Sequence, residues 1–113
     1  MNNNDSSILH HILRYCEQIN KTSAEFDNSK DRFMESATFR NAICMCLLQI
    51  GELATIIDDE FKEENPTIQW REIKLLRNIV AHRYGQIDYE IIWDICANDI
   101  PILVAFCIEK LKD

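Results

Sequence analysis

The sequence predicts an all-α fold, an up-and-down bundle of four to five helices. Only 2 of the 113 residues are glycine and 2 are proline, so the chain has few places to turn. Apolar residues make up 47% of the chain and recur at i, i+3 and i+4 along several long stretches, which is the spacing of one helix face. This length favours a single domain of residues 1–113 around one core.

We expect residues 1–5 to form a frayed tail ahead of the first helix. Asp5, Ser6 or Ser7 can cap that helix by accepting hydrogen bonds from its first free amides. Helical spacing then continues to about Thr22. The predicted buried face is Ile8, Leu9, Ile12, Leu13, Cys16 and Ile19.

A polar turn over residues 23–31 and a short helical piece at Phe33 lead into a long second helix, predicted over residues 36–62. Gly51 lies inside this helix, where glycine costs about 1 kcal/mol relative to alanine. We therefore expect another helix to approach closely at Gly51.

The third main helix follows a break at residues 63–66, and Trp70 is predicted to anchor its start by packing. It should end near Gly85, which can take the left-handed conformation that closes a helix. Asp88 is placed to cap the last helix, and Pro101 should kink or divide it. Counting Pro101 as a break gives five helices instead of four.

The formal net charge of −7 argues against nonspecific binding of nucleic acid over the whole surface. Residues 71–84 differ, with four cations and one anion, a local charge of +3. A basic island of this kind can hold a polyanion locally, although its cations are also compatible with an ordinary solvated face.

Composition also bears on compartment and metal binding. The five cysteines include no C-x-x-C pair, so they are interpreted as reduced, mostly buried residues of a cytoplasmic protein, with no metal site. By this interpretation no apolar run approaches the roughly 20 residues that cross a bilayer, so we expect no membrane contact. The polar start of the chain is not a targeting segment.

Most of the chemically useful side chains lie in residues 75–89, on the third helix and just after it. At about 100° per residue, an apolar arc should face the core, with a polar face almost opposite it and a flank between them. The core arc is Ile73, Leu76, Ile79 and Val80; the outer face is Arg71, Asn78 and His82; the flank carries Arg77 and Tyr84.

An outward-facing His82 is either a solvated surface residue or part of an interface. If two copies of this helix meet across a two-fold axis, Arg77 and His82 of both chains line one cleft. Two imidazoles could then act as general base and general acid on RNA, while arginine stabilises the charged transition state. Asn78 could orient the imidazole or remain a solvated amide, and Tyr84 could simply pack on Ile87.

These residues resemble the HEPN superfamily and, within it, the HepT-like toxins of prokaryotic toxin–antitoxin pairs. The resemblance rests on an R-x4-H-x-Y signature with linked motifs in order along nearly the whole chain. The matching residues are Arg77-Asn78, His82 and Tyr84, then Ile50-Gly51-Glu52, Ile68-Gln69-Trp70, Ile87-Asp88 and Trp93. One departure is Gln69, where the family often has proline.

The resemblance implies a helical bundle that dimerises through the motif helix and cleaves RNA without a metal. It implies that Arg77 and His82 are catalytic and that Asn78 is the polar residue beside the arginine. It further implies a cognate antitoxin, a minimal nucleotidyltransferase that transfers AMP from ATP to Tyr84. The added bulk and negative charge would block RNA phosphate beside the cleft.

We therefore predict an endoribonuclease toxin with no cofactor. Arg71, Lys74 and Arg83 are further candidates for binding RNA phosphate. The main alternative is a non-catalytic helical dimer that binds and positions a nucleotidyltransferase. A third possibility is a plain four-helix core with surface charges, which predicts a monomer.

Overall fold

A computed structural model describes residues 1–82 and 85–112, and the side chain of His82 also lies outside that description. All regular structure in the described part of the chain is helical, which confirms the predicted all-α class. The helices are α1 (Asn3–Glu25), α2 (Lys30–Glu35), α3 (Ala37–Thr55), α4 (Asp59–Glu64), α5 (Trp70–His82), α6 (Tyr89–Asp94), the π-helical segment η1 (Ile95–Asp99) and α7 (Ile100–Lys110).

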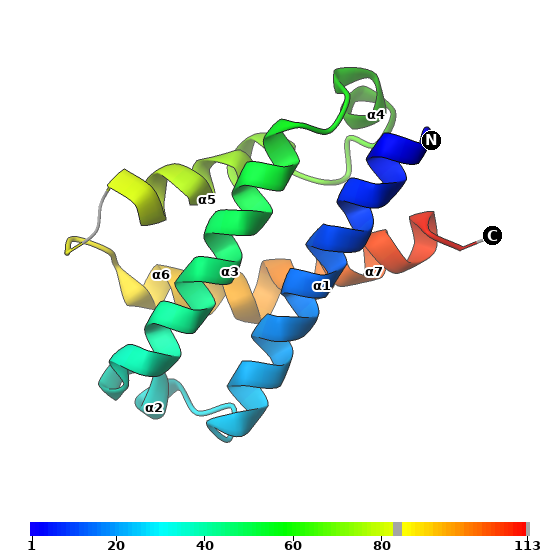
Figure 1. Cartoon of the computed structure of the whole chain (residues 1–113). Helices are drawn as coiled ribbons and strands as arrows, with labels where there is room; N and C mark the ends of the chain where they lie inside the picture. The colour runs from blue at the N-terminus through cyan, green and yellow to red at the C-terminus, as the bar shows by residue number, and fades with distance from the viewer. Residues whose placement is uncertain (83–84, 113) are drawn as a thin grey trace.

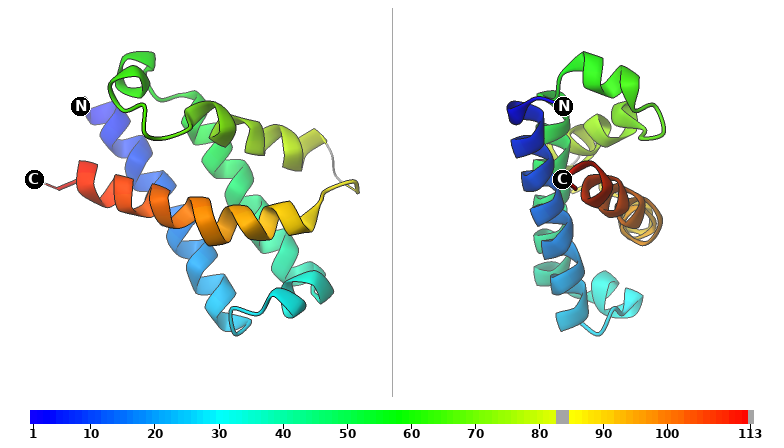
Figure 2. Two further views of the ribbon diagram at one scale, coloured as in Figure 1. Left: turned by 180° about the vertical axis from the view of Figure 1, so that it is seen from behind. Right: turned by 90° about the vertical axis from the view of Figure 1, so that its right-hand side faces the viewer.

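The helices form two layers. The long helices α1 and α3 run antiparallel side by side, and α5 and the composite helix α6–η1–α7 lie across one face of this pair (Figures 1 and 2). Helix α5 packs mainly on α3, and α7 packs on α1. The core between the layers includes Leu9, Ile12, Cys16, Phe33, Phe39, Leu47, Ile50, Ile92, Ile100 and Cys107, all at most 2% exposed.

Helix α1 begins at Asn3, so residues 3–5 of the expected tail are helical. Asn2, and not Asp5 or a serine, caps the helix, since its side chain accepts a hydrogen bond from the Asp5 amide at 2.7 Å. Asp5 is only 2% exposed, and its Oδ1 accepts from the Asp58 amide at 3.1 Å. The helix also runs on to Glu25, past the predicted end at Thr22.

The predicted helix over residues 36–62 is two helices. Helix α3 ends at Thr55, and α4 begins at Asp59. The helical apolar spacing continues to Ile57, which is buried. The amide of the next residue, Asp58, donates a hydrogen bond to the side chain of Asp5 in α1. That hydrogen bond joins residues 53 apart in sequence, so the spacing of apolar residues could not reveal it.

The C-terminal helix is continuous from Tyr89 to Lys110, with η1 just ahead of Pro101. The π-helical segment changes the hydrogen-bonding register where proline lacks a donor, so the proline does not end the helix. Its most apolar 18-residue window has a mean hydropathy of 1.9, long and apolar enough to cross a membrane. This corrects the expectation that no such run exists. Only 22% of that window is buried, and Ile92 and Leu103 belong to this buried part.

The cysteines are free thiols that fill the interior. Four are buried and Cys96 is half-buried, as predicted. Burial raises the pKa of Cys16 and of Cys107 to about 12, so both thiols stay protonated near neutral pH.

Candidate active site

The motif helix α5 crosses α3 at Gly51, and this contact fixes the backbone of Arg77. A Cβ placed on Gly51 would lie 2.9 Å from the Arg77 amide nitrogen and 3.1 Å from the Ile73 carbonyl oxygen. Only a residue without a side chain allows so close an approach. The prediction that Gly51 marks a close helix crossing is confirmed.

The residue after Gly51 orients the arginine side chain. Oε1 of Glu52 lies 2.6 Å from Nε of Arg77, and the two side chains are 48% and 44% exposed. The contact of this ion pair is at Nε, and the arginine side chain is 44% exposed, so a bound anion can reach the guanidinium. A guanidinium can bind a phosphate through two parallel hydrogen bonds.

The outer side of α5 carries a basic groove of about 360 Å3, which we define by Thr55, Asp59, Lys62, Trp70, Arg71, Lys74, Leu75, Arg77 and Asn78. Arg71, Lys74 and Asn78 are exposed, whereas Leu76 and Val80 on the opposite side are buried. The predicted division of α5 into an inner apolar arc and an outer polar face is therefore confirmed. The structure also brings Arg71, Lys74, Arg77 and Asn78 into one groove.

The rest of the signature is described only in part. His82 is the last residue of α5, one helical turn after Asn78, and its side chain lies outside the described residues. Arg83 and Tyr84 lie outside them entirely, so their predicted roles stay predictions. Gly85 has a φ of +89°, the left-handed conformation expected where the motif helix closes.

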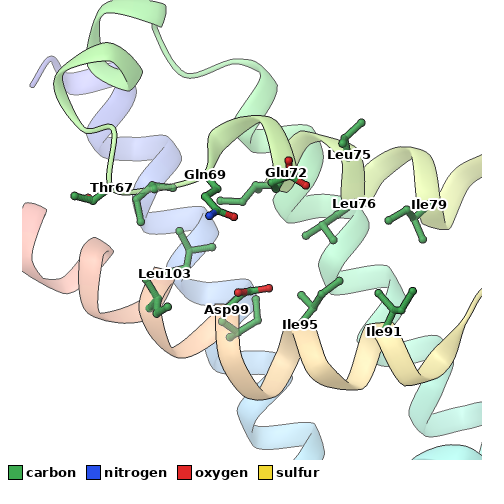
Figure 3. Close-up of a pocket in the computed structure, with 14 residues that line it drawn as sticks. Thr67, Gln69, Glu72, Leu75, Leu76, Ile79, Ile91, Ile95, Asp99 and Leu103 are labelled. Carbon is green, nitrogen blue, oxygen red and sulfur yellow. The ribbon is translucent and has the colours of Figure 1, made fainter.

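An apolar groove of about 410 Å3 runs between α5 and α6–η1–α7 (Figure 3). Leu75, Leu76 and Ile79 line one wall, and Ile91, Ile95, Ile102 and Leu103 line the other. Three of these side chains are unusually open for large apolar residues: Leu75 is 41% exposed, Ile91 50% and Ile102 58%. The carboxylates of Glu72 and Asp99 lie on opposite walls. Leu75 lines both grooves, so the two surfaces are contiguous.

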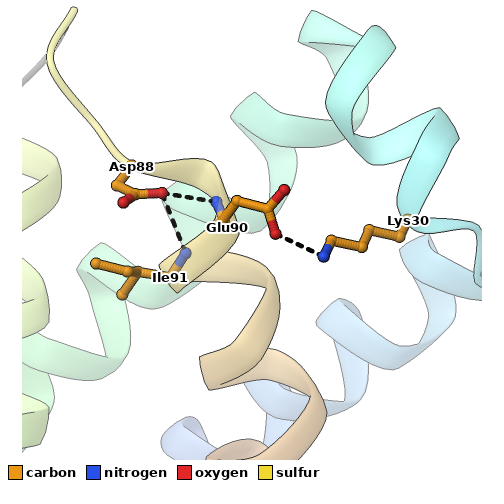
Figure 4. Close-up of polar contacts among 4 residues, drawn as sticks. All are labelled: Lys30, Asp88, Glu90 and Ile91. Carbon is orange, nitrogen blue, oxygen red and sulfur yellow. Dashed lines mark hydrogen bonds and ion pairs between the residues drawn. The ribbon is translucent and has the colours of Figure 1, made fainter.

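The start of α6 is fixed by polar contacts (Figure 4). Asp88 caps the helix, as predicted, because its Oδ1 accepts from the amides of Glu90 at 3.0 Å and Ile91 at 3.4 Å. Glu90 pairs with Lys30 of α2. These contacts hold Ile91 at the mouth of the apolar groove.

Sequence reasoning missed two features of this region. Glu52 was noted within a motif but given no role, although its position beside Gly51 at a helix crossing is a usable signal. Lys62 was not noted, because it stands in an acidic stretch and reaches the groove from another helix. Among the described residues, no three His, Cys, Asp or Glu side chains gather where they could hold a metal ion.

Comparison with known proteins gives consistent matches. The family model described as "Ribonuclease HepT-like" matches residues 12–109. The chain is 32% identical over 95 residues to "Putative RNase MJ1380" of Methanocaldococcus jannaschii, covering 84% of this chain and 85% of that one. It is 36% identical over 62 residues to "Probable ribonuclease HepT" of Thermococcus cleftensis, covering 55% of this chain and 56% of the other.

The comparison with solved structures found no significant match to the chain. The family model spans most of the chain, from Ile12 within α1 to Glu109 within α7, and includes the crossing of α3 and α5 and both grooves. Relatives of similar length carry ribonuclease names. The chain therefore belongs to the HepT-like family of ribonucleases, within the HEPN superfamily.

Proposed function

We propose that this protein is a cytoplasmic, metal-independent endoribonuclease toxin that acts as a homodimer, with Arg77 and His82 of both chains forming the active site. The observation that carries the proposal is the placement of Arg77. It lies at the close crossing of α3 and α5, pairs with Glu52 at Nε, and lines a groove rich in cations. That arrangement suits an anion whose charge grows during reaction.

The chemistry follows from the residue types. One imidazole removes the proton from a ribose 2′-hydroxyl, whose oxygen attacks the adjacent phosphorus. The bond from phosphorus to the 5′-oxygen breaks, and the second imidazole donates a proton to that oxygen. The products are a 2′,3′-cyclic phosphate and a 5′-hydroxyl. Arg77 stabilises the extra negative charge on the phosphate oxygens in the transition state.

The apolar groove supports a second copy as the partner. Large exposed apolar surface on a small domain is typical of an interaction site, and this one adjoins the basic groove through Leu75. Covering it with a second copy would bring two motif helices together and supply the second histidine. Light scattering should give twice the mass of the chain. A monomer that cosediments with phosphatidylcholine vesicles would instead assign the exposed apolar helix to a membrane.

The purified protein should cleave RNA in excess EDTA and leave 2′,3′-cyclic phosphate ends. His82→Ala should abolish cleavage while the dimer persists, and His10→Ala, a change at an exposed histidine of α1, should leave cleavage unchanged. Equal cleavage by the His82 variant would show that the nuclease was a contaminant. Nucleotide binding without cleavage would favour a non-catalytic partner of a nucleotidyltransferase.

The proposal includes the antitoxin. A nucleotidyltransferase that moves AMP from ATP to Tyr84 would place a phosphodiester and a nucleoside next to the motif helix, where they would repel and obstruct RNA. Co-expression with such a partner should add a discrete mass increment per AMP, which Tyr84→Phe should remove. An unchanged increment in that variant would assign the modification to another residue.

A further inference from the structure

The basic groove extends past the motif arginine to Lys62, which comes from α4. A rigid corner sets the position of this lysine. Trp70 Nε1 donates to the Asn65 carbonyl oxygen at 3.1 Å, and Asn65 Nδ2 donates to the Phe61 carbonyl oxygen at 2.8 Å. The rings of Phe61 and Trp70 also pack edge to face, with centroids 6.1 Å apart. The end of α4 is thereby fastened to the start of α5.

The cations of this groove outnumber the acids that could neutralise them. Arg77 has Glu52, but Lys62, Arg71 and Lys74 take part in none of the ion pairs found among the described residues. Asp59 is the one acid among the described residues that line the groove. Three cations thus share a single carboxylate, on a chain whose net charge is −7.

The charged form of Lys62 is destabilised by burial and by this excess of cations. The residue is half-buried, and burial followed by the neighbouring Lys74 ammonium lowers its pKa below the ordinary value, although Asp59 and Asp5 act in the opposite direction. A cation held partly out of water beside another cation is unfavourable unless an anion joins them. An anion bound in the groove would remove that cost.

We propose that Lys62, Lys74 and Arg71 form a second phosphate-binding subsite, which holds the RNA backbone at a phosphate flanking the one that Arg77 engages. This inference rests on the proposed ribonuclease function. Lys62 is here a binding residue and not a catalytic one, so it acts on RNA affinity and not on the chemical step. Cations on separate helices, placed along one groove, suit a chain of successive phosphates better than a single small anion.

Binding of a fluorescent 2′-O-methyl RNA oligonucleotide, which cannot be cleaved, should be measured by anisotropy over a range of salt concentrations. Lys62→Gln should weaken binding several-fold and reduce the slope of log K against log salt by about 0.7 to 1, the loss of one phosphate contact. Lys62→Arg should keep both values near wild type. Asp59→Asn, which removes the opposing charge, should tighten binding.

The matched control is Lys21→Gln, an exposed lysine on α1, which should change neither value beyond a small nonspecific effect. Thermal unfolding separates binding from folding, because removal of a half-buried cation that faces Lys74 should leave the melting temperature equal or higher. Wild-type affinity and salt slope in Lys62→Gln would overturn the subsite.

Separate measurements test the ribonuclease function and the phosphate-binding subsite, so either proposal can be overturned without the other. RNA cleavage with His82 intact but not with His82→Ala supports the nuclease, whatever Lys62 does. Cleavage by Lys62→Gln should show a raised KM and an unchanged kcat; a fall in kcat alone would overturn the binding role. If Lys62→Gln loses its complex with a co-expressed nucleotidyltransferase yet binds RNA normally, the groove serves a protein and the subsite is wrong.

Discussion

The basic groove and the apolar groove lie on two sides of one helix, share Leu75, and differ in nearly every other property. In the basic groove, Lys62, Arg71, Lys74 and Arg77 face a single lining acid. In the apolar groove, most of the lining side chains are hydrocarbon, and its polar groups include the acids Glu72 and Asp99. Both grooves are open in the isolated chain, although core residues such as Ile100 and Trp70 form part of their lining.

The difference teaches how α5 can serve two kinds of partner at once. Binding to charged groups depends strongly on salt and suits a polyanion, whereas burial of apolar surface is directionless and suits a protein partner. Helix α5 is 13 residues long, and its residues contribute to the core, to the basic groove and to the apolar groove. Substitutions on the two sides should therefore have separable effects.

The largest effect is expected on the basic side. Arg77→Ala should lower kcat for RNA cleavage by about 100- to 1,000-fold, the usual loss when one donor to a developing charge is removed. The dimer should persist, since the arginine lies outside the apolar groove. Arg14→Ala, at an exposed arginine of α1, is the control. Cleavage within a few-fold of wild type would show that Arg77 does not stabilise the transition state.

A charge on the apolar side should break the proposed dimer. Ile91→Asp would bury an unpaired carboxylate in the interface and cost about 3 kcal/mol or more, which weakens dimerisation roughly 100-fold. Analytical ultracentrifugation should show dissociation, with activity recovered at high protein concentration. Ile56→Asp, at a residue that is 59% exposed and outside the groove, should leave the dimer intact. An unchanged dimer in the Ile91 variant would place the interface elsewhere.

The crossing that positions both surfaces can be tested at Gly51. Gly51→Ala gains about 1 kcal/mol of helix propensity, but its methyl group meets the Arg77 amide at 2.9 Å. Since the clash involves backbone, α3 and α5 must separate, and overpacking of this kind costs about 1–3 kcal/mol. We expect a lower melting temperature and weaker cleavage. A more stable protein would show that the helices separate freely.

The smallest effect is expected at Glu52. Its ion pair with Arg77 is about half exposed, so it should be worth at most about 1 kcal/mol. Glu52→Ala frees the guanidinium and should lower kcat about 2- to 5-fold, whereas Glu52→Gln keeps an acceptor for Nε and should lie close to wild type. Equal losses in the two variants would show that the carboxylate charge matters and the orientation does not.

The features that the sequence predicted correctly are those with a local cause. Helical periodicity identified the inner and outer faces of α5, Asp88 was recognised as a cap, and Gly51 was recognised as a crossing point. Each of these depends on residue type and on neighbours within a few positions. The same reasoning placed Arg71 and Asn78 on the outer face and Arg77 on its flank, and the structure brings these residues into one groove with Lys74.

The features that it missed depend on contacts between distant segments. At the break between α3 and α4, the Asp58 amide donates to Asp5 of α1, and Lys62 of α4 lines the basic groove beside residues of α5. The apolar groove arises because α5 and α7 each pack on a different helix of the other layer. Apolar spacing shows which residues avoid water, but not which helix covers them.

The hydrogen bond between Asp5 and Asp58 connects the N-terminal end of α1 to the start of α4. Asn2 adds a second tie, since its Nδ2 donates to Oδ2 of Asp58 at 2.6 Å. A truncation or a rigid fusion that disturbs these two side chains would loosen the corner from which α4 starts, and with it the lysine at the far edge of the basic groove. Affinity tags on this protein therefore belong on a flexible linker ahead of Met1, because an N-terminal alteration could otherwise be mistaken for a defect in RNA binding.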